Sequence, residues 1–172
     1  MSGIICLLCI GAVIALDQIT KYLAVRFLMP VPTFPIMQDV LHLTYVENRG
    51  AAFGMLQNHR WVFMIVSTLL MAVILFVMFK YKKYLHPIML TGLCFTVGGG
   101  VGNMIDRTIK GFVVDFIDFT LIDFAVFNVA DAFICVGVGL IVLDVILKKS
   151  DLAFLDDKKS DEVTDDEADT DK

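Results

Sequence analysis

Two aspartates in apolar surroundings are the residues of this sequence best suited to chemistry. Asp115 lies in the run Val-Val-Asp-Phe at 113–116, and Asp131 ends the run Asn-Val-Ala-Asp at 128–131. A carboxylate near hydrocarbon is costly and therefore indicates a functional site. If the two carboxylates meet, repulsion leaves the pair sharing a proton. Such a pair can hydrolyse an amide, since one carboxylate takes a proton from water while the other protonates the carbonyl oxygen.

Helix capping and neighbouring acids both compete with a catalytic interpretation of these aspartates. Asn128 is a good helix N-cap, and an acid three residues later resembles a capping box, so Asp131 taken alone is explained by capping. Asp115 is less easily explained by a structural role, because its apolar neighbours disfavour the ionised form unless a partner is present. Asp118 and Asp123 compete with Asp115 for a catalytic position, and spacing alone does not choose between them.

The elements that position these carboxylates are expected to be membrane-spanning helices. The 172 residues are 58% hydrophobic with a mean hydropathy of +0.77, above the roughly 45–50% apolar content of soluble domains. A spanning helix needs about 20 largely apolar residues. Four stretches approach this requirement, at 3–27, 61–79, 88–105 and 125–147. The sequence therefore predicts an all-α membrane protein with four transmembrane helices.

The first apolar stretch has an alternative interpretation as a cleaved signal peptide, because Val-Ile-Ala at 13–15 resembles a cleavage site. Against this, no Lys or Arg precedes the apolar run, and apolar residues resume after Asp17. We therefore expect an uncleaved first span.

Lysines predict the orientation of the chain. They crowd residues 80–83 after the second span and follow the fourth span at 148–149. By the positive-inside rule these ends, and both termini, are cytoplasmic. Residues 28–60 and 106–124 then face the other side, which places Asp115 and Asp131 at the outer face.

The chain is expected to form one membrane domain over 1–149, followed by a cytoplasmic tail over 150–172. The tail carries ten acidic and three basic residues. It cannot bury enough apolar surface to fold, so we expect it to be disordered.

The first outer segment is predicted to leave the helical conformation. Prolines at 30, 32 and 35 break a continuing helix. Residues 40–46 are rich in β-branched and aromatic side chains, which predicts a short strand. Residues 51–56 form a small, mildly amphipathic piece that we expect to lie against the membrane surface.

Polar residues inside the spans are open to structural interpretations as well. Asp17 and Lys21 stand four residues apart with the acid first, the favourable order for a helical ion pair. Asp106 could pair with Arg107 or cap local backbone, and a structural ion pair explains it better than catalysis does. Asn103 and Arg107, again four apart, share one helix face.

Glycines and cysteines in the spans are expected to serve packing. The glycine-rich run at 98–102 lacks the Walker lysine and a preceding strand. Gly98 and Gly102 instead form the small-xxx-small pattern of close helix contacts. All cysteines fall inside apolar stretches, where packing is favoured over metal or redox roles. The three histidines are scattered, which disfavours serine and zinc peptidases.

Five ordered motifs resemble bacterial lipoprotein signal peptidase, also called signal peptidase II. They are Asp-Gln-Ile-Thr-Lys at 17–21, Asn-Arg-Gly-Ala-Ala-Phe-Gly at 48–54, the glycine-rich run ending in Asp-Arg at 98–107, Val-Val-Asp-Phe at 113–116, and Phe-Asn-Val-Ala-Asp at 127–131. The resemblance leaves out the acidic tail.

The resemblance implies an aspartic endopeptidase of the bacterial inner membrane. It would remove signal peptides from prolipoproteins, cutting on the N-terminal side of a diacylglyceryl-modified cysteine. Asp115 and Asp131 would be the catalytic pair, because Asp118 and Asp123 match no motif. The substrate-binding or supporting residues would be Asp17, Lys21, Asn48, Gly50, Asn103, Arg107 and Asn128.

The resemblance also implies a small extracytoplasmic β-cradle over about 33–56, accompanied by a short surface helix. No metal or organic cofactor is needed. The expected partners are the prolipoprotein substrates and membrane lipid, with no nucleic acid and no particular oligomeric partner indicated. A rival class is a small ion- or proton-coupled transporter or channel subunit. Such proteins place their acids near the bilayer midplane, often with internal repeats, whereas here the acids lie at one edge and no repeat is found.

Overall fold

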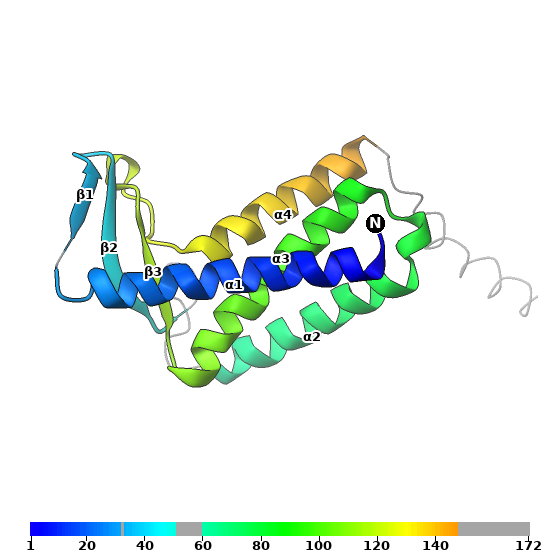
Figure 1. Cartoon of the computed structure of the whole chain (residues 1–172), viewed down its shortest axis with the longest axis horizontal. Helices are drawn as coiled ribbons and strands as arrows, with labels where there is room; N and C mark the ends of the chain where they lie inside the picture. Colours follow the sequence, from blue (N-terminus) through cyan, green and yellow to red (C-terminus); the bar gives the residue numbers. More distant parts are fainter. Residues whose placement is uncertain (32, 51–59, 148–172) are drawn as a thin grey trace, which may run out of the picture.

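The computed structural model describes residues 1–31, 33–50 and 60–147. It is mostly helical, with a small sheet at one end of the helices (Figure 1). The helices are α1 (Gly3–Phe27), α2 (Arg60–Lys80), α3 (Pro87–Ile109) and α4 (Val129–Ile146), with short 3-10 helices η2 (Lys82–Tyr84) and η3 (Thr120–Ile122). The strands are β1 (Phe34–Met37), β2 (Leu41–Asn48) and β3 (Val113–Asp118). The expected surface helix at 51–56 and the acidic tail lie outside the described residues.

The helix boundaries follow the predicted apolar stretches closely. The first predicted span coincides with α1, and the second and third are each extended by a few residues. The fourth helix begins later than predicted, because Asn128 caps it and residues 125–127 lead in as extended chain. Among the described residues, α1, α3 and α4 are long and apolar enough to cross a membrane, while α2 contributes the shorter apolar stretch Met64–Lys80.

Helix α3 lies at the centre and contacts the three other helices. The predicted packing role of its glycines is confirmed. A Cβ added to Gly98 would lie 2.7 Å from the Cβ of Val13 on α1. A Cβ added to Gly99 would collide with the carbonyl oxygen of Ala130 on α4. Small residues at these positions therefore let the helices approach closely.

The sheet has the order β1-β2-β3, with both pairs antiparallel. The predicted strand at 40–46 is present as β2 and runs two residues further, to Asn48. Strand β3 was not predicted from the sequence. It pairs Val46 of β2 with Asp115 and Asn48 with Val113. This register brings the end of β2 beside the first candidate carboxylate.

A buried apolar cluster attaches the sheet to the end of α1. Ala24 of α1 and Leu28, the residue that caps its C-terminus, pack against Val114 and Phe116 of β3. Val114 is fully buried, and full burial of such a side chain stabilises a fold by about 1.5–3 kcal/mol. Because Val114 and Phe116 flank Asp115, the cluster fixes the strand position from which that aspartate projects.

Candidate active site

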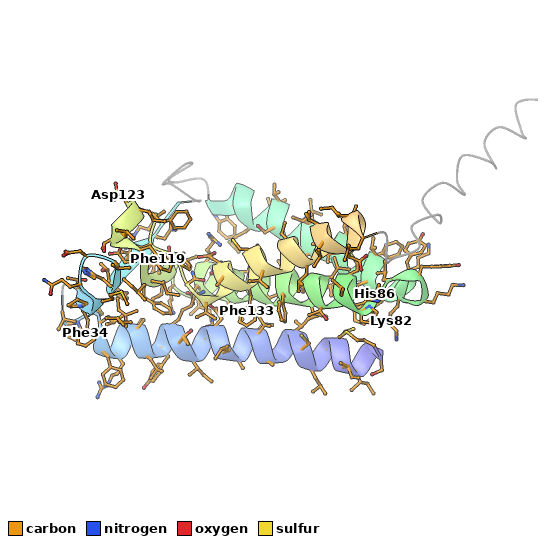
Figure 2. All side chains as sticks on the ribbon, turned by 90° about the horizontal axis from the view of Figure 1, so that it is seen from above. Phe34, Lys82, His86, Phe119, Asp123 and Phe133 are labelled. Carbon is orange, nitrogen blue, oxygen red and sulfur yellow. The ribbon has the colours of Figure 1, made fainter. Side chains whose placement is uncertain are left out.

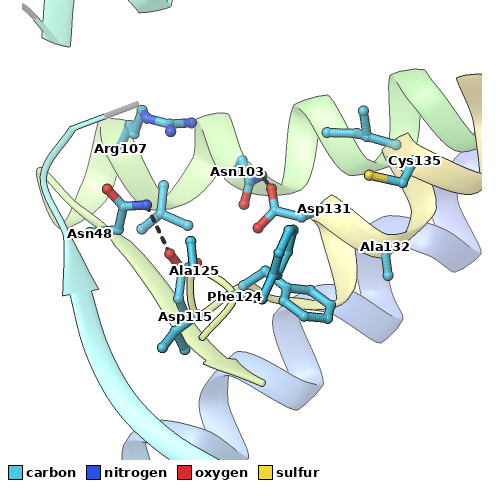
Figure 3. Close-up of a pocket in the computed structure, with 13 residues that line it drawn as sticks. Asn48, Asn103, Arg107, Asp115, Phe124, Ala125, Asp131, Ala132 and Cys135 are labelled. Carbon is cyan, nitrogen blue, oxygen red and sulfur yellow. Dashed lines mark hydrogen bonds between the residues drawn. The ribbon is translucent and has the colours of Figure 1, made fainter. Parts of the chain in front are cut away.

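A cavity of about 440 Å³ opens between β3, the first turns of α4 and the last turns of α3. Asp115 and Asp131 both line it, so the structure brings together the two carboxylates selected from the sequence (Figure 3). The polar part of the lining also includes Asn48, Asn103 and Arg107. The remaining wall is largely apolar and consists of Val113, Phe124, Ala125, Val126, Phe127, Ala132, Ile134 and Cys135.

Asp115 is held by two amide donors. Its Oδ2 accepts a hydrogen bond of 2.9 Å from Asn48 Nδ2, and its Oδ1 accepts one of 2.6 Å from Asn128 Nδ2. Burial of the carboxyl is the main cause that raises its pKa to about 6, and the negative charge of Asp131 adds to the rise. The two amides and the positive charge of Lys21 act in the opposite direction. A pKa of about 6 lies closer to neutral pH than that of an exposed carboxyl, a property that suits general acid–base chemistry.

Asp131 is held by two donors of its own. Its Oδ1 accepts from Asn103 Nδ2 at 2.8 Å, and its Oδ2 accepts from the backbone N–H of Asn128 at 3.2 Å. Asn128 in turn accepts at Oδ1 from the Asp131 N–H, which completes the predicted capping box. The capping interpretation is therefore correct, and it does not exclude a role in chemistry, because the capped carboxylate faces the cavity.

Asn128 joins the two carboxylates. It is fully buried, and its Nδ2 group donates to Asp115 Oδ1 and, at 3.2 Å, to Asn103 Oδ1. The same residue fixes Asp131 through the capping box. Buried amides are stable only when their donors and acceptors are satisfied, so one side chain holds both acids in a defined relation.

Asn48 is oriented by the chain that follows it. The backbone N–H of Gly50 donates to Asn48 Oδ1 at 3.0 Å, which leaves Nδ2 to face Asp115. Gly50 is buried. The family resemblance implied a role for Gly50 without a physical reason, and this hydrogen bond supplies one.

Two of the predicted supporting residues form a buried ion pair behind the cavity. Lys21 Nζ lies 2.9 Å from Asp17 Oδ2, which confirms the predicted helical pair. The structural ion pair predicted for Asp106 is also present, but Arg107 as its partner is wrong. Asp106 instead pairs with Lys21 at 3.3 Å and with Lys110 at 3.0 Å. Lys110, the C-cap of α3, lies four residues after Asp106, a spacing that places the two side chains on one side of the helix.

The two competing aspartates lie elsewhere. Asp118 accepts a hydrogen bond of 2.8 Å from Thr44 within the sheet. Asp123 follows η3 in a left-handed conformation, with φ 49°. Neither belongs to the cavity lining. Of Asp115, Asp118 and Asp123, Asp115 is therefore the aspartate that shares the cavity with Asp131.

The apolar wall of the cavity was not predicted from the sequence. Cys135 follows Asp131 by four residues, so helical spacing could have placed its side chain beside the carboxylate. Phe124 and Phe127 come from the chain between η3 and α4, where no periodic signal exists. In the described part of the chain, no three His, Cys, Asp or Glu side chains are grouped to hold a metal ion.

Known proteins match this chain over most of its length. A sequence model of the family described as signal peptidase (SPase) II matches residues 9–147. The lipoprotein signal peptidase of Brevibacillus brevis is 46% identical over 150 residues, which cover 87% of this chain and 95% of that protein. That of Caldanaerobacter subterraneus is 48% identical over 128 residues, covering 74% and 86%.

The fold is similar to that of a solved structure described as a bacterial membrane enzyme. The TM-score is 0.75 at 30% sequence identity, and the match covers 84% of this chain and 89% of the other. A second bacterial membrane enzyme gives a TM-score of 0.70 at 31% identity, over 81% and 91% of the two chains. The chain belongs to the signal peptidase II family.

Proposed function

We propose that Asp115 and Asp131 are the catalytic pair with which this signal peptidase removes signal peptides from prolipoproteins. The observation that carries the proposal is that two carboxylates from different elements line one cavity and are joined through Asn128. The ion- or proton-coupled transporter considered from the sequence has no support from the comparisons, whose curated relatives are peptidases.

The chemistry follows from the environments of the two acids. We assign the starting proton to Asp115, because burial raises its pKa to about 6 and so favours its protonated form relative to an exposed carboxyl. Asp131 takes a proton from water as the water oxygen attacks the scissile carbonyl carbon, and Asp115 gives its proton to the carbonyl oxygen. As the tetrahedral intermediate collapses, the C–N bond breaks, Asp131 protonates the leaving amine, and Asp115 takes back the hydroxyl proton.

The apolar lining of the cavity supports a lipid-modified substrate. Its wall beyond the polar groups is apolar, and Cys135 is exposed at its edge. We propose that the enzyme cuts on the N-terminal side of a diacylglyceryl-modified cysteine, with the acyl chains in the bilayer. Lipid burial contributes about 0.8 kcal/mol per CH₂ group, so it holds the scissile bond at the membrane surface beside the two acids.

The arrangement of apolar and charged groups supports a four-span topology. Large side chains project from α2 without being covered, including Trp61, Leu69 and Phe76 at 55–62% exposure, which fits a lipid-facing fourth span. Lys82 and His86 lie at the end of the helices away from Phe34 and Asp123 (Figure 2). With the lysines inside, both termini are cytoplasmic, residues 1–149 form the inner-membrane domain, residues 150–172 form a cytoplasmic tail, and the cavity faces outward.

The test is cleavage of a diacylglyceryl-modified prolipoprotein by the purified enzyme in detergent. Asp115→Asn and Asp131→Asn should each lower turnover by about 10³-fold or more, since general acid–base catalysis contributes 10²–10⁴-fold. Asp118→Asn is the matched control, because it changes an aspartate of the same strand that does not line the cavity. Folded Asp115→Asn and Asp131→Asn variants that cleave at the parent rate would show that the assignment is wrong.

A further inference from the structure

We propose that Lys21 is a positioning residue whose ammonium group, through one hydrogen bond and two ion pairs, sets the separation and orientation of Asp115 and Asp131. The proposal rests on the catalytic roles given to these two aspartates above. Lys21 belongs to α1, which carries neither acid, and its side chain is fully buried. A buried ammonium is costly unless it is paired and hydrogen-bonded, so its partners must account for its presence.

The ammonium group has three buried oxygen partners, one through a hydrogen bond and two through ion pairs. Lys21 Nζ lies 2.8 Å from Asn103 Oδ1, 2.9 Å from Asp17 Oδ2 and 3.3 Å from Asp106 Oδ2. A lysine has three donors and no acceptor, so three oxygens around its nitrogen suit its chemistry. If Lys21 served only as the helical partner of Asp17, the contact with Asp17 alone would be enough. The other two reach a different helix, α3.

The contact with Asn103 leads to Asp131. Asn103 Oδ1 accepts from Lys21 and from Asn128, which directs the other end of the amide, Nδ2, to Asp131 Oδ1 at 2.8 Å. A flipped amide would turn its oxygen toward a carboxylate, and two acceptors repel. Lys21 therefore holds the amide in the orientation that donates to the acid.

The contact with Asp17 leads to the same acid by a second route. Asp17 Oδ1 accepts from the backbone N–H of Ala130 at 3.0 Å, and Ala130 directly precedes Asp131. Asp17 fits there because Gly102 has no Cβ, which would otherwise collide with its carboxylate. The first turn of α4 is thus attached to α1.

The contact with Asp106 leads to the other acid. Asp106 Oδ2 accepts from the backbone N–H of Val114 at 3.1 Å, and Val114 directly precedes Asp115. Each of the three partners of the ammonium group therefore also holds part of the candidate site. Asn103 binds the Asp131 side chain, Asp17 binds the backbone next to Asp131, and Asp106 binds the backbone next to Asp115. Loss of the ammonium would leave two buried carboxylates close together, whose repulsion would displace both backbone attachments.

The decisive variant is Lys21→Met, which keeps the length of the side chain and removes its charge and donors. We expect kcat to fall by about 100-fold while KM changes less than about threefold, because the lost interaction positions the acids without binding substrate. The pH–rate limb that belongs to Asp115 should move to higher pH. The positive charge of Lys21 lowers the pKa of Asp115, so its removal favours the protonated acid.

Lys110→Met is the matched control. It removes the other cation bound to Asp106, at 3.0 Å, but makes no described contact with Asn103 or Asp17. Its kcat should stay within about threefold of the parent, with an unshifted pH limb, since a partly exposed ion pair contributes little.

A structural role alone predicts a different result. In that case Lys21→Met would lose activity only in proportion to the folded fraction, with an unshifted pH limb, and the proposal would be overturned. If Lys21→Met does not fold, Lys21→Gln decides by the same two readouts, because its neutral amide retains two donors. Inactive Asp115→Asn and Asp131→Asn variants beside Lys21 variants that behave like Lys110→Met would refute this inference and leave the catalytic pair intact.

Discussion

The two ends of the helix bundle are filled in opposite ways. At the end that carries the sheet, the buried side chains include Asp17, Lys21, Asn103, Asp106, Asp115 and Asn128. Toward the other end, α1, α2 and α3 meet in an apolar cluster of Cys6, Ile10, Met78, Leu85, Met89, Leu90, Leu93, Cys94 and Val97. A polar contact also lies there, with His86 Nδ1 3.5 Å from Asp144 Oδ1.

Because one end is filled with polar groups and the other mainly with apolar ones, we expect substitutions at the two ends to affect different properties. A buried polar network is stable only when its members satisfy one another, so removing one group leaves others unpaired. An apolar cluster loses packing energy in proportion to the atoms removed, and its other members keep their contacts. Substitutions at the sheet end should therefore change turnover strongly, and substitutions in the apolar cluster should change stability with turnover intact.

Asn128→Ala should have the largest effect among single substitutions of uncharged residues. It removes the donor shared by Asp115 and Asn103 and the cap of α4. We expect turnover to fall by about 10²–10³-fold, as for the loss of a preorganised donor, and stability to fall by about 1 kcal/mol from the cap. Turnover at saturating substrate measures the loss of activity, and thermal unfolding in detergent measures the loss of stability. Turnover within threefold of the parent would contradict the bridging role.

Gly99→Ala should have the next largest effect. The added Cβ collides with the carbonyl oxygen of Ala130, next to Asp131. The start of α4 must move, and a misplacement of about 1 Å can cost about 10²-fold in rate, so we expect at least a tenfold loss of turnover.

Gly139→Ala is the matched control for this substitution. It adds the same methyl group in α4 where nothing lies within 4 Å. Its turnover should be unchanged, with stability equal to the parent or higher by up to about 1 kcal/mol from helix propensity. Equal turnover of Gly99→Ala and Gly139→Ala variants would show that the start of α4 does not set the geometry of the site.

Asn48→Ala should have a moderate effect that depends on pH. The hydrogen bond of 2.9 Å that the Asn48 side-chain amide donates to Asp115 lowers the pKa of that acid. Without it the pKa rises further above about 6, so the protonated form persists to higher pH and the corresponding limb of the pH–rate profile shifts upward. Turnover at the optimum should fall by about tenfold, since one hydrogen bond to a charged group contributes about 1.5–3 kcal/mol. A shift to lower pH would contradict the assignment of that limb to Asp115.

Leu90→Ala should leave turnover per folded molecule within about twofold of the parent. Leu90 is 1% exposed in the apolar cluster, and its truncation creates a cavity that lowers stability by about 2 kcal/mol. The measurement is unfolding by denaturing detergent, compared with turnover at low temperature. A loss of turnover larger than the loss of folded protein would show that the two ends are coupled.

Much of the architecture could be predicted from local pattern alone. The apolar stretches indicated the positions of the helices, and the pair Asp17–Lys21, the Asn128–Asp131 capping box and the Gly98 contact follow from spacings of three or four residues. These features could be predicted because each depends on residues within one helical turn or on the absence of a side chain. Strand β3 could not, because its stability comes from pairing with β2, more than sixty residues earlier in the chain.

The site shows the same division. The order of amino acids establishes which residues carry carboxylates, amides and an ammonium group in apolar surroundings, and the family resemblance selected Asp115 and Asp131 among the acids. Packing of the helices and the sheet determines that Asp106 pairs with Lys21 instead of its neighbour Arg107, that Asn128 bridges two acids, and that Lys21 reaches Asn103 across 82 positions of sequence. Burial leaves each of these polar groups no water to bind, so its partner is whichever group the packed helices bring near, at any distance along the chain.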